Sequence, residues 1–237
     1  LVDSSHLESS FMKSVRNYRY GPGTVMIHCA LNEPLEWKAG AEFSDSTYVH
    51  ICPYVDDVAR TYQQVMAGKL PDSPMLVVGQ PTSVDPDRAP DDKHVLWIQV
   101  RAVPPQIQDD AAGKISASSW ERAIQPFEQR VFDKLEQYAP GIREKMLDFT
   151  TLGPGDLESD NPNLVGGDSL AGSHHLDQHW GFRPFPNTSN YRTPIDNLYM
   201  CGASTWPGGG LNATSGYLLA RQLTTSTLSR TWNALTA

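Results

Sequence analysis

The sequence predicts a mixed α/β (α+β) fold, with a largely antiparallel sheet and helices packed against it. Short apolar runs alternate with amphipathic helical patterns, which is typical of a sheet covered by helices. The runs at 75–80 and 94–102 are joined by a long polar loop, so we expect them to pair as antiparallel strands. With 39% hydrophobic residues among 237, the chain can bury a substantial core.

The expected elements follow in order along the chain. They are a short helix within 1–20, strands at 24–31 and 48–52, a helix at 55–66, strands at 75–80 and 94–102, a helical region at 118–138, a helical turn within 141–147 and a strand at 148–152. Pro126 should divide the helical region into a short segment, a kink and a helix that begins at Pro126. Phe127, Val131, Leu135 and Tyr138 form its predicted buried stripe.

Regular patterning is lost between residues 153 and 197, and a loop of this length is usually functional or docked against something. An apolar run at 198–201 then predicts a buried strand, and helix-forming residues follow at 212–228. Between them stand three consecutive glycines, 208–210. Glycines permit close backbone approach, and a helix start presents N–H groups and a positive dipole end. The stretch predicts a site for a phosphate, a carboxylate or a cofactor carbonyl, or else a plain connection.

Composition argues against several classes of protein. The net charge of −8 disfavours a nucleic-acid surface or a polybasic membrane patch. No apolar run reaches transmembrane length, and the N-terminus lacks a signal-peptide pattern. Cys29, Cys52 and Cys201 are odd in number and widely separated, which favours reduced thiols and a cytoplasmic location.

The stretch Tyr199-Met200-Cys201-Gly202-Ala203-Ser204-Thr205-Trp206-Pro207-Gly208-Gly209-Gly210 resembles the C-terminal flavin-binding signature of phytoene-desaturase-like FAD oxidoreductases. This group lies within the amine oxidase superfamily. Five shorter stretches are similar to one branch of the family and occur in the family's order. They are Asp85-Pro86-Asp87-Arg88-Ala89-Pro90, Ala139-Pro140-Gly141, Gly166-Gly167-Asp168, Arg183-Pro184 and Tyr191-Arg192-Thr193-Pro194.

The resemblance implies a two-domain flavoprotein whose N-terminal strand, G-x-G-x-x-G loop and helix hold the FAD pyrophosphate. No G-x-G-x-x-G occurs in this sequence. The chain is therefore expected to supply only the C-terminal half: a substrate-binding domain at 1–195, and a segment at 196–237 that completes a Rossmann-like FAD-binding domain. A partner chain or fragment carrying the N-terminal half is expected, which makes the active protein a heteromer.

The resemblance also implies which residues contact FAD. Gly202 and Ala203 would pass beside the ribityl and pyrophosphate groups, and Gly209, Gly210, Leu211 and Asn212 would face the pyrimidine edge of the ring. Accepting a hydride places negative charge on that edge, which N–H groups at a helix start stabilise.

His175 and His179 are the candidate catalytic residues, since an imidazole can act as a general base. Together with His174 they offer metal ligands if the segment is helical, but Gly172 and Gly181 leave room for a short helix at best. No metal site is expected, and a substrate-facing or interface cluster is favoured. Arg183 can pair with Asp168 or with a substrate carboxylate, and the structural pair is favoured.

The predicted function is an FAD-dependent oxidoreductase of the dehydrogenase, oxidase or desaturase type. It would dehydrogenate a C–C or C–N bond of a small organic substrate, with transfer of a hydride to the flavin. The alternative is a non-catalytic binding or scaffold subunit derived from such a flavoprotein. Retention of three glycines favours the first prediction.

Overall fold

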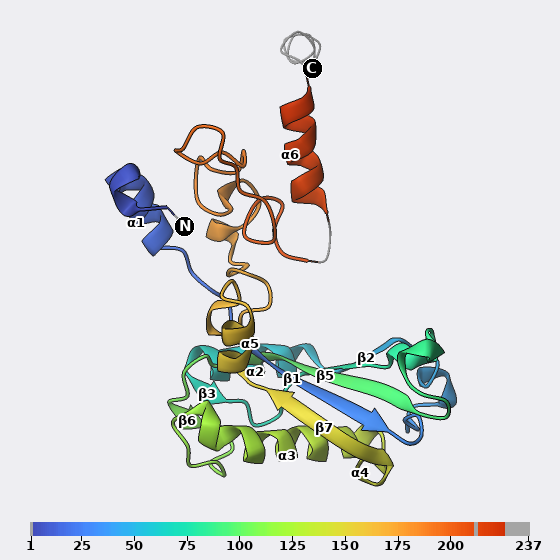
Figure 1. The fold of residues 1–237 in the computed structure, drawn as a ribbon. Coiled ribbons are helices and arrows are strands. Elements are labelled where there is room, and N and C mark those ends of the chain that lie inside the picture. The colour runs from blue at the N-terminus through green and yellow to red at the C-terminus, as the bar shows by residue number, and fades with distance from the viewer. Residues whose placement is uncertain (1, 211–212, 226–237) are drawn as a thin grey trace. The chain divides into compact units, whose positions relative to one another are not determined.

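The computed structural model describes residues 2–210 and 213–225 and divides the chain into two compact units (Figure 1). The sheet unit comprises Pro22–Ser169, and the loop unit comprises Leu1–Gly21 and Leu170–Ala237. The boundary predicted between residues 195 and 196 would divide a substrate-binding domain from a cofactor-binding segment. That functional division stays a prediction.

The sheet unit is built on five antiparallel strands in the order β2-β4-β5-β1-β7. These are β1 (Gly23–Leu31), β2 (Tyr48–Ile51), β4 (Leu76–Gly79), β5 (His94–Val103) and β7 (Met146–Leu152). The expected pairing of β4 with β5 is confirmed, as is the mixed fold with a mostly antiparallel sheet. A second, two-stranded sheet joins β3 (Lys69–Leu70) to β6 (Asp109–Asp110) in parallel.

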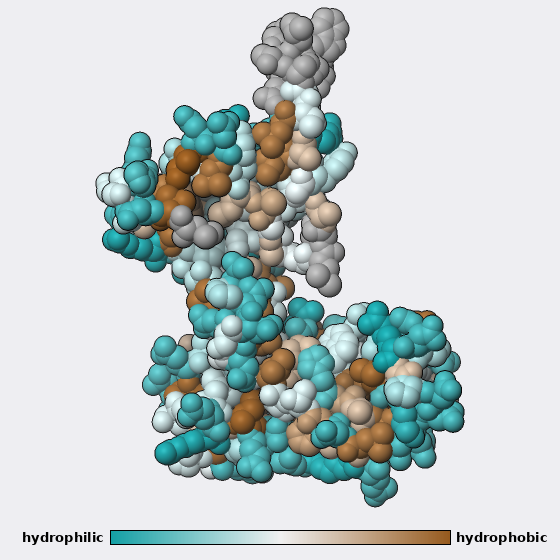
Figure 2. Space-filling model, in the orientation of Figure 1, coloured by the Kyte–Doolittle hydropathy of each residue, from teal (hydrophilic) through white to brown (hydrophobic). Residues whose placement is uncertain are grey.

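The helices of the sheet unit include α2 (Val55–Met66), α4 (Ile142–Lys145) and α5 (Pro154–Asp160). The prediction of α2 is confirmed, but its buried residues are Thr61 and Val65, so much of its apolar stripe is exposed. The sequence pattern missed α5, whose start is fixed by the Gly153 N–H donating to Asp156 Oδ2 at 2.8 Å. Hydrophobic residues reach the surface of both units (Figure 2).

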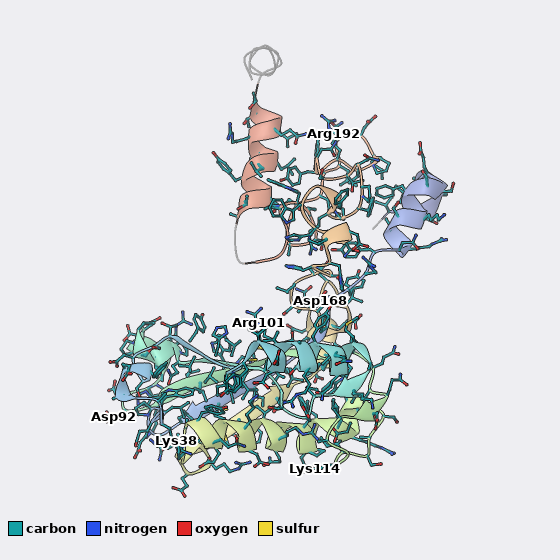
Figure 3. All side chains as sticks on the ribbon, turned by 180° about the vertical axis from the view of Figure 1, so that it is seen from behind. Lys38, Asp92, Arg101, Lys114, Asp168 and Arg192 are labelled. Atoms are coloured by element: carbon teal, nitrogen blue, oxygen red, sulfur yellow. The ribbon has the colours of Figure 1, made fainter. Side chains whose placement is uncertain are left out.

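Some charged side chains of the sheet unit lie on its surface. Lys38, Asp92, Arg101 and Lys114 are all exposed (Figure 3). Within the described residues, none of the helices combines the length and apolarity needed to cross a lipid bilayer.

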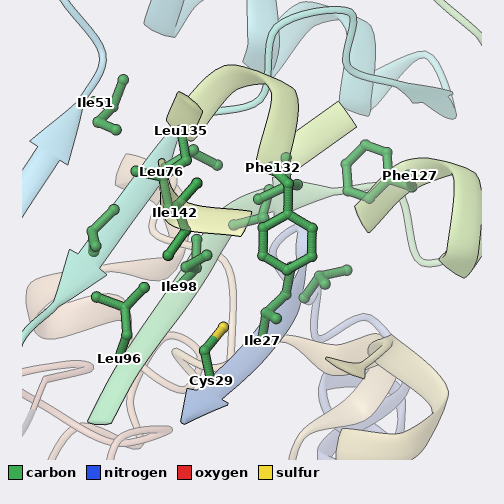
Figure 4. Packing of buried hydrophobic residues seen from close by; sticks show 14 of the residues in the cluster. Ile27, Cys29, Ile51, Leu76, Leu96, Ile98, Phe127, Phe132, Leu135 and Ile142 are labelled. Atoms are coloured by element: carbon green, nitrogen blue, oxygen red, sulfur yellow. The ribbon is translucent and has the colours of Figure 1, made fainter. Parts of the chain in front are cut away.

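The core lies between one face of the sheet and α3 (Trp120–Tyr138). Alternate residues of β1 and β5, such as Ile27, Cys29 and Ile98, belong to one buried cluster with Phe127 and other residues of α3 (Figure 4). Each fully buried apolar side chain contributes about 1.5–3 kcal/mol to folding. Burial also raises the pKa of the Cys29 thiol to about 12, so this cysteine stays protonated and unreactive.

The helix α3 is one continuous element that contains Pro126, so the predicted division at this residue is wrong. A proline inside a helix removes one hydrogen bond and costs about 3 kcal/mol. Phe127, Val131 and Leu135 are completely buried, and the free energy of burying them outweighs that cost.

The loop unit contains α1 (Ser9–Arg16), α6 (Thr214–Thr224) and, between residues 170 and 210, loops with short 3-10 turns. The short helix expected near the N-terminus is confirmed. The buried strand expected at 198–201 is wrong, because the segment forms one isolated bridge, between Arg192 and Tyr199. Leu198 and Met200 are 42% and 43% exposed. The segment is extended, but the described residues provide a neighbour on one side only.

Candidate functional site

The glycine loop, residues 202–210, begins with a tight turn and leads towards α6. The N–H and Oγ1 of Thr205 donate to the Gly202 carbonyl at 3.1 and 2.8 Å, which closes the turn. Gly202 has φ of +116°, a value that L side chains rarely adopt. Its N–H donates to Ser215 Oγ at 2.9 Å, at the start of α6. The expected order of glycine loop and helix is therefore present, although the Gly202 N–H already has a partner.

Two histidines pack against the glycine loop. A Cβ on Gly208 would lie 3.1 Å from His179 Cε1, and one on Gly209 would lie 3.0 Å from His174 Nε2. The two imidazole rings lie 5.1 Å apart at 31° to each other. Gly208 and Gly209 thus leave room for a histidine pair of the same chain, which is a reason for glycine that involves no cofactor.

Of the two predicted catalytic residues, the structure brings His179 to the glycine loop and leaves His175 elsewhere. The short turn Leu176–Gln178 separates them, so they do not share a helix face. His175 is exposed, and its backbone N–H donates to Ser173 Oγ at 3.3 Å. The residue paired with His179 is His174, which sequence spacing did not single out. Among the residues that the structure describes, no group of three or more side chains could hold a metal ion.

The predicted cofactor-binding residues Gly202, Ala203, Gly209 and Gly210 all lie in the glycine loop. Gly202 and Gly210 are exposed, with φ of +116° and +129°. The Ala203 carbonyl accepts a hydrogen bond from Arg183 Nε at 2.8 Å. Leu211 and Asn212 lie outside the described residues. The assignment of these six residues to FAD stays a prediction.

Arg183 is completely buried, and its partners are backbone carbonyls rather than the carboxylate that sequence reasoning expected. Trp180 and Phe182, its near neighbours in sequence, are 69% and 52% exposed. Sequence reasoning missed the burial of Arg183, because nothing in the local pattern marks it as an interior residue.

Tyr191 is a second buried polar group in the loop unit. Its side chain is 5% exposed, and its hydroxyl has no hydrogen-bond partner among the described residues. Burial, together with the nearby Cys201, raises the pKa of this phenol, so it stays protonated. A buried hydroxyl without a partner is costly, and a water or a bound ligand can satisfy it.

The sheet unit carries a row of side chains on the face opposite the core. The strand register places Tyr48, Gly79, Trp97, His28 and Thr150 side by side across the five strands. Trp97 covers Gly79, where a Cβ would collide with the indole, and its ring lies 5.3 Å from that of Tyr48. His28 is exposed beside it. This aromatic row offers a stacking surface next to an imidazole, and the glycine within a strand was the overlooked signal.

The sheet unit also has a pocket of about 210 Å³ lined by Leu31, Leu35, Gln80, Thr82, His94 and neighbouring residues. Typical small-molecule sites enclose about 300–1,000 Å³, so this one is small. It contains none of the predicted site residues.

Comparisons with known proteins identify relatives that are oxidoreductases by name. The chain is 34% identical over 158 residues to pyridine nucleotide-disulfide oxidoreductase domain-containing protein 2 of Mus musculus, covering 66% of this chain and 26% of that protein. It is 26% identical over 209 residues to a 4,4'-diapophytoene desaturase of Staphylococcus haemolyticus, covering 87% of this chain and 38% of the desaturase. No family model matches.

A solved structure supports the fold. The crystal structure of an oxidoreductase from Methanosarcina mazei matches 94% of this chain and 38% of that chain, with a TM-score of 0.51 and 14% identity. The chain thus spans well under half the length of the proteins that it matches. By its relatives the chain is similar to oxidoreductases that include 4,4'-diapophytoene and phytoene desaturases.

Proposed function

We propose that this chain is the C-terminal half of an FAD-dependent oxidoreductase and works with a partner that carries the N-terminal half. The relatives support the oxidoreductase class. The observation that carries the proposal is an incomplete sheet edge in the loop unit, directly before the glycine loop.

This open edge is the segment 198–201. On one side the Met200 N–H donates to the Tyr191 carbonyl at 2.9 Å, and the Thr193 N–H to the Leu198 carbonyl at 3.3 Å. On the other side, the backbone groups of Tyr199 and Cys201 have no backbone partner among the described residues. An exposed edge with apolar side chains is a template for pairing with another strand. We assign this edge to a strand of the partner.

The helix α6 adds a second surface for the same partner. Its one buried residue within Thr214–Thr224 is Ser215, whereas Tyr217 and Leu223 are 61% and 49% exposed. Ala213, Gly216 and Ala220 form a small-residue face at helical spacing. A helix of this length needs packing against other elements for stability, and α6 buries little of its surface within this chain. A sheet of the partner would provide that packing.

The residues of the loop unit fit the ring-facing part of an FAD site. Gly202 and Gly210 expose backbone at φ values that allow close approach, and the unpaired Tyr191 hydroxyl offers a hydrogen bond. FAD, when bound, supplies a hydride acceptor. The chain's own contribution would be to hold the ring against the exposed backbone of Gly202 and Gly210 and to bind the substrate.

We assign substrate binding to the aromatic row of the sheet unit. Trp97 and Tyr48 present ring surface that suits a flat or unsaturated organic molecule, and the His28 imidazole can accept a proton from it. Replacing Trp97 with Ala should raise KM and leave FAD content unchanged. An unaltered KM would remove the row from the substrate site.

The second candidate function is a non-catalytic scaffold subunit. One observation favours it: Gly208 and Gly209 are already explained by the packing of His179 and His174. The three glycines therefore no longer argue for a flavin by themselves. Flavin content of the assembled protein decides between the two functions.

The test is to purify this chain alone, and together with a polypeptide that begins with the strand, G-x-G-x-x-G loop and helix. We expect flavin absorbance in the assembled pair and weak or no FAD binding by the chain alone. Full FAD binding by the lone chain, with a colourless pair, would refute the proposal.

Gly216 provides a matched pair of variants for the assembly surface, because a Cβ there meets no atom within 4 Å. Gly216→Ala should stabilise α6 by about 0.5–1 kcal/mol and permit assembly. Gly216→Trp should leave the isolated chain folded and weaken assembly at least tenfold in size-exclusion binding assays. Equal assembly by both variants would exclude α6 from the interface.

A further inference from the structure

Among the described residues, Arg183 is the largest completely buried side chain. Its Nε donates to the Ala203 carbonyl at 2.8 Å. Nη1 donates to the carbonyls of Ser173 and Gln178 at 3.0 and 3.3 Å, and Nη2 to those of Leu170, Ala171 and Gly172 at 3.2, 3.1 and 3.5 Å. A guanidinium has five N–H donors in a rigid plane, and here all of its nitrogens face backbone.

These hydrogen bonds join two segments that are distant in sequence. Five of the six acceptors lie between residues 170 and 178, in the stretch that carries His174, and the sixth is Ala203 in the glycine loop. The planar fork of Arg reaches both segments at once. A lysine would bring the charge but only a single point of donation, so it could not replace all of these bonds.

The charge of Arg183 has no anionic partner within the loop unit. Among the described residues of that unit, no carboxylate lies within 4.0 Å of its nitrogens. Six backbone carbonyls accept hydrogen bonds from the buried cation. The side chain also lies against the glycine loop, since a Cβ on Gly208 would be 3.7 Å from Arg183 Cδ. A cation held next to this loop attracts an electron-rich group placed on the loop's exposed side.

We infer that Arg183 is the positioning residue of the cofactor site. It fixes Ala203 and the glycine loop against the segment 170–178, and its charge favours the more negative, reduced form of the flavin ring. This inference rests on the proposed function, and it adds a residue that no resemblance assigned.

The experiment compares Arg183→Met and Arg183→Lys with the wild type in the pair assembled with the N-terminal half. Arg16→Gln is the matched control, because Arg16 is exposed on α1 of the same unit. Three quantities are measured: amide hydrogen exchange, FAD affinity by titration, and the reduction potential of the bound flavin. Exchange in β1 and β5 reports whether the sheet unit remains folded.

For Arg183→Met we expect FAD binding to weaken roughly tenfold to hundredfold, as for the loss of charged hydrogen bonds. We also expect a more negative reduction potential and faster exchange at Ser173 and Thr205, with β1 and β5 unchanged. Arg183→Lys retains the positive charge but lacks the planar guanidinium group with its several N–H donors. It should recover the potential while exchange at Ser173 and Thr205 stays fast, a split that a purely structural role does not produce.

Wild-type FAD affinity and potential in Arg183→Met would overturn the inference and leave the proposed function standing. If Arg183→Met unfolds the loop unit, Arg183→Lys decides. A reduction potential well below that of the wild type, despite the retained charge, would then refute the role of the charge. A wild-type pair that takes up no FAD would instead overturn the proposed function, and this inference with it.

Discussion

The sheet unit and the loop unit are held together by different interactions. In the sheet unit a continuous cluster of apolar side chains fills the space between the sheet and α3. In the described part of the loop unit the buried side chains are mostly polar: Ser173, Gln178, Arg183, Thr205 and Ser215, together with Tyr191. Apolar burial is non-directional and tolerant, whereas hydrogen bonds to backbone require fixed geometry. The sheet unit therefore has the core of an independent domain, and the loop unit depends on individual polar contacts.

The largest effect should follow from a cavity in the apolar cluster. Phe127→Ala removes a completely buried ring and should lower the free energy of unfolding by about 3–5 kcal/mol, measured by urea denaturation. The control is Leu147→Ala in the same unit, since Leu147 is 56% exposed and should change stability by less than about 0.5 kcal/mol. Similar losses in the two variants would contradict the assignment of the core.

A smaller effect tests whether the sheet unit also relies on a polar contact. Asp110 is 1% exposed and accepts hydrogen bonds from both Arg130 Nη atoms at 2.7 Å and from the N–H groups of Lys114 and Ile115. Burial raises the pKa of this carboxyl, but the hydrogen bonds from Arg130 and the backbone outweigh that effect and lower it to about 2.

The folded-state pKa of Asp110 lies below its unfolded value, so the stabilisation is present above that unfolded value and is lost as pH falls towards 2. We expect a loss of about 2 kcal/mol across this range, visible in acid-dependent denaturation and absent in Asp110→Asn. Asp133→Asn is the matched control, because Asp133 is 71% exposed in its ion pair with Arg143. An Asp110→Asn profile as steep as that of the wild type would show that other carboxylates cause the acid dependence.

The smallest effect should come from the loop unit and stay within it. The Gln178 side chain, 5% exposed, accepts from the Arg19 N–H at 2.9 Å and donates to the Arg19 carbonyl at 2.6 Å. Gln178→Leu should raise amide exchange at Arg19 and Ser173 by an amount equal to about 1–2 kcal/mol of local stability. Amide exchange in β5 should not change. The control is Gln63→Leu, which alters an exposed residue and should leave exchange in both units unchanged. Faster exchange in β5 would show that the two units unfold together.

The sequence predicted the sheet unit better than the loop unit because the sheet unit's signals are local. Alternating apolar residues in β1 and the helical spacing in α2 and α3 reflect backbone periods of two and 3.6 residues. The continuity of α3 through Pro126 could not be read from the sequence, since burial against the sheet decides it. The exposure of Leu198 and Met200 was also missed. An apolar run becomes buried only where another element packs against it, and the sequence pattern does not show that such an element is lacking.

The candidate site was predictable only in part. The glycine loop and the helix after it were predicted, since glycine and helix-forming residues mark such a connection. The pairing of His174 with His179 was not, because it depends on the turn between them. The enclosure of Arg183 depends on backbone conformations such as the positive φ of Ala171 and Trp180, which composition does not reveal.

The loop unit joins the two ends of the chain, and this determines the order in which the molecule can be built. The Tyr18 hydroxyl donates to the Ala171 carbonyl at 2.7 Å, and Arg19 bonds to Gln178, across separations of 153 and 159 residues. During synthesis the sheet unit, which is contiguous, emerges and can fold before either contact exists. Residues 18 and 19 must wait until residues 171 and 178 have been synthesised, so these polar contacts of the loop unit form late.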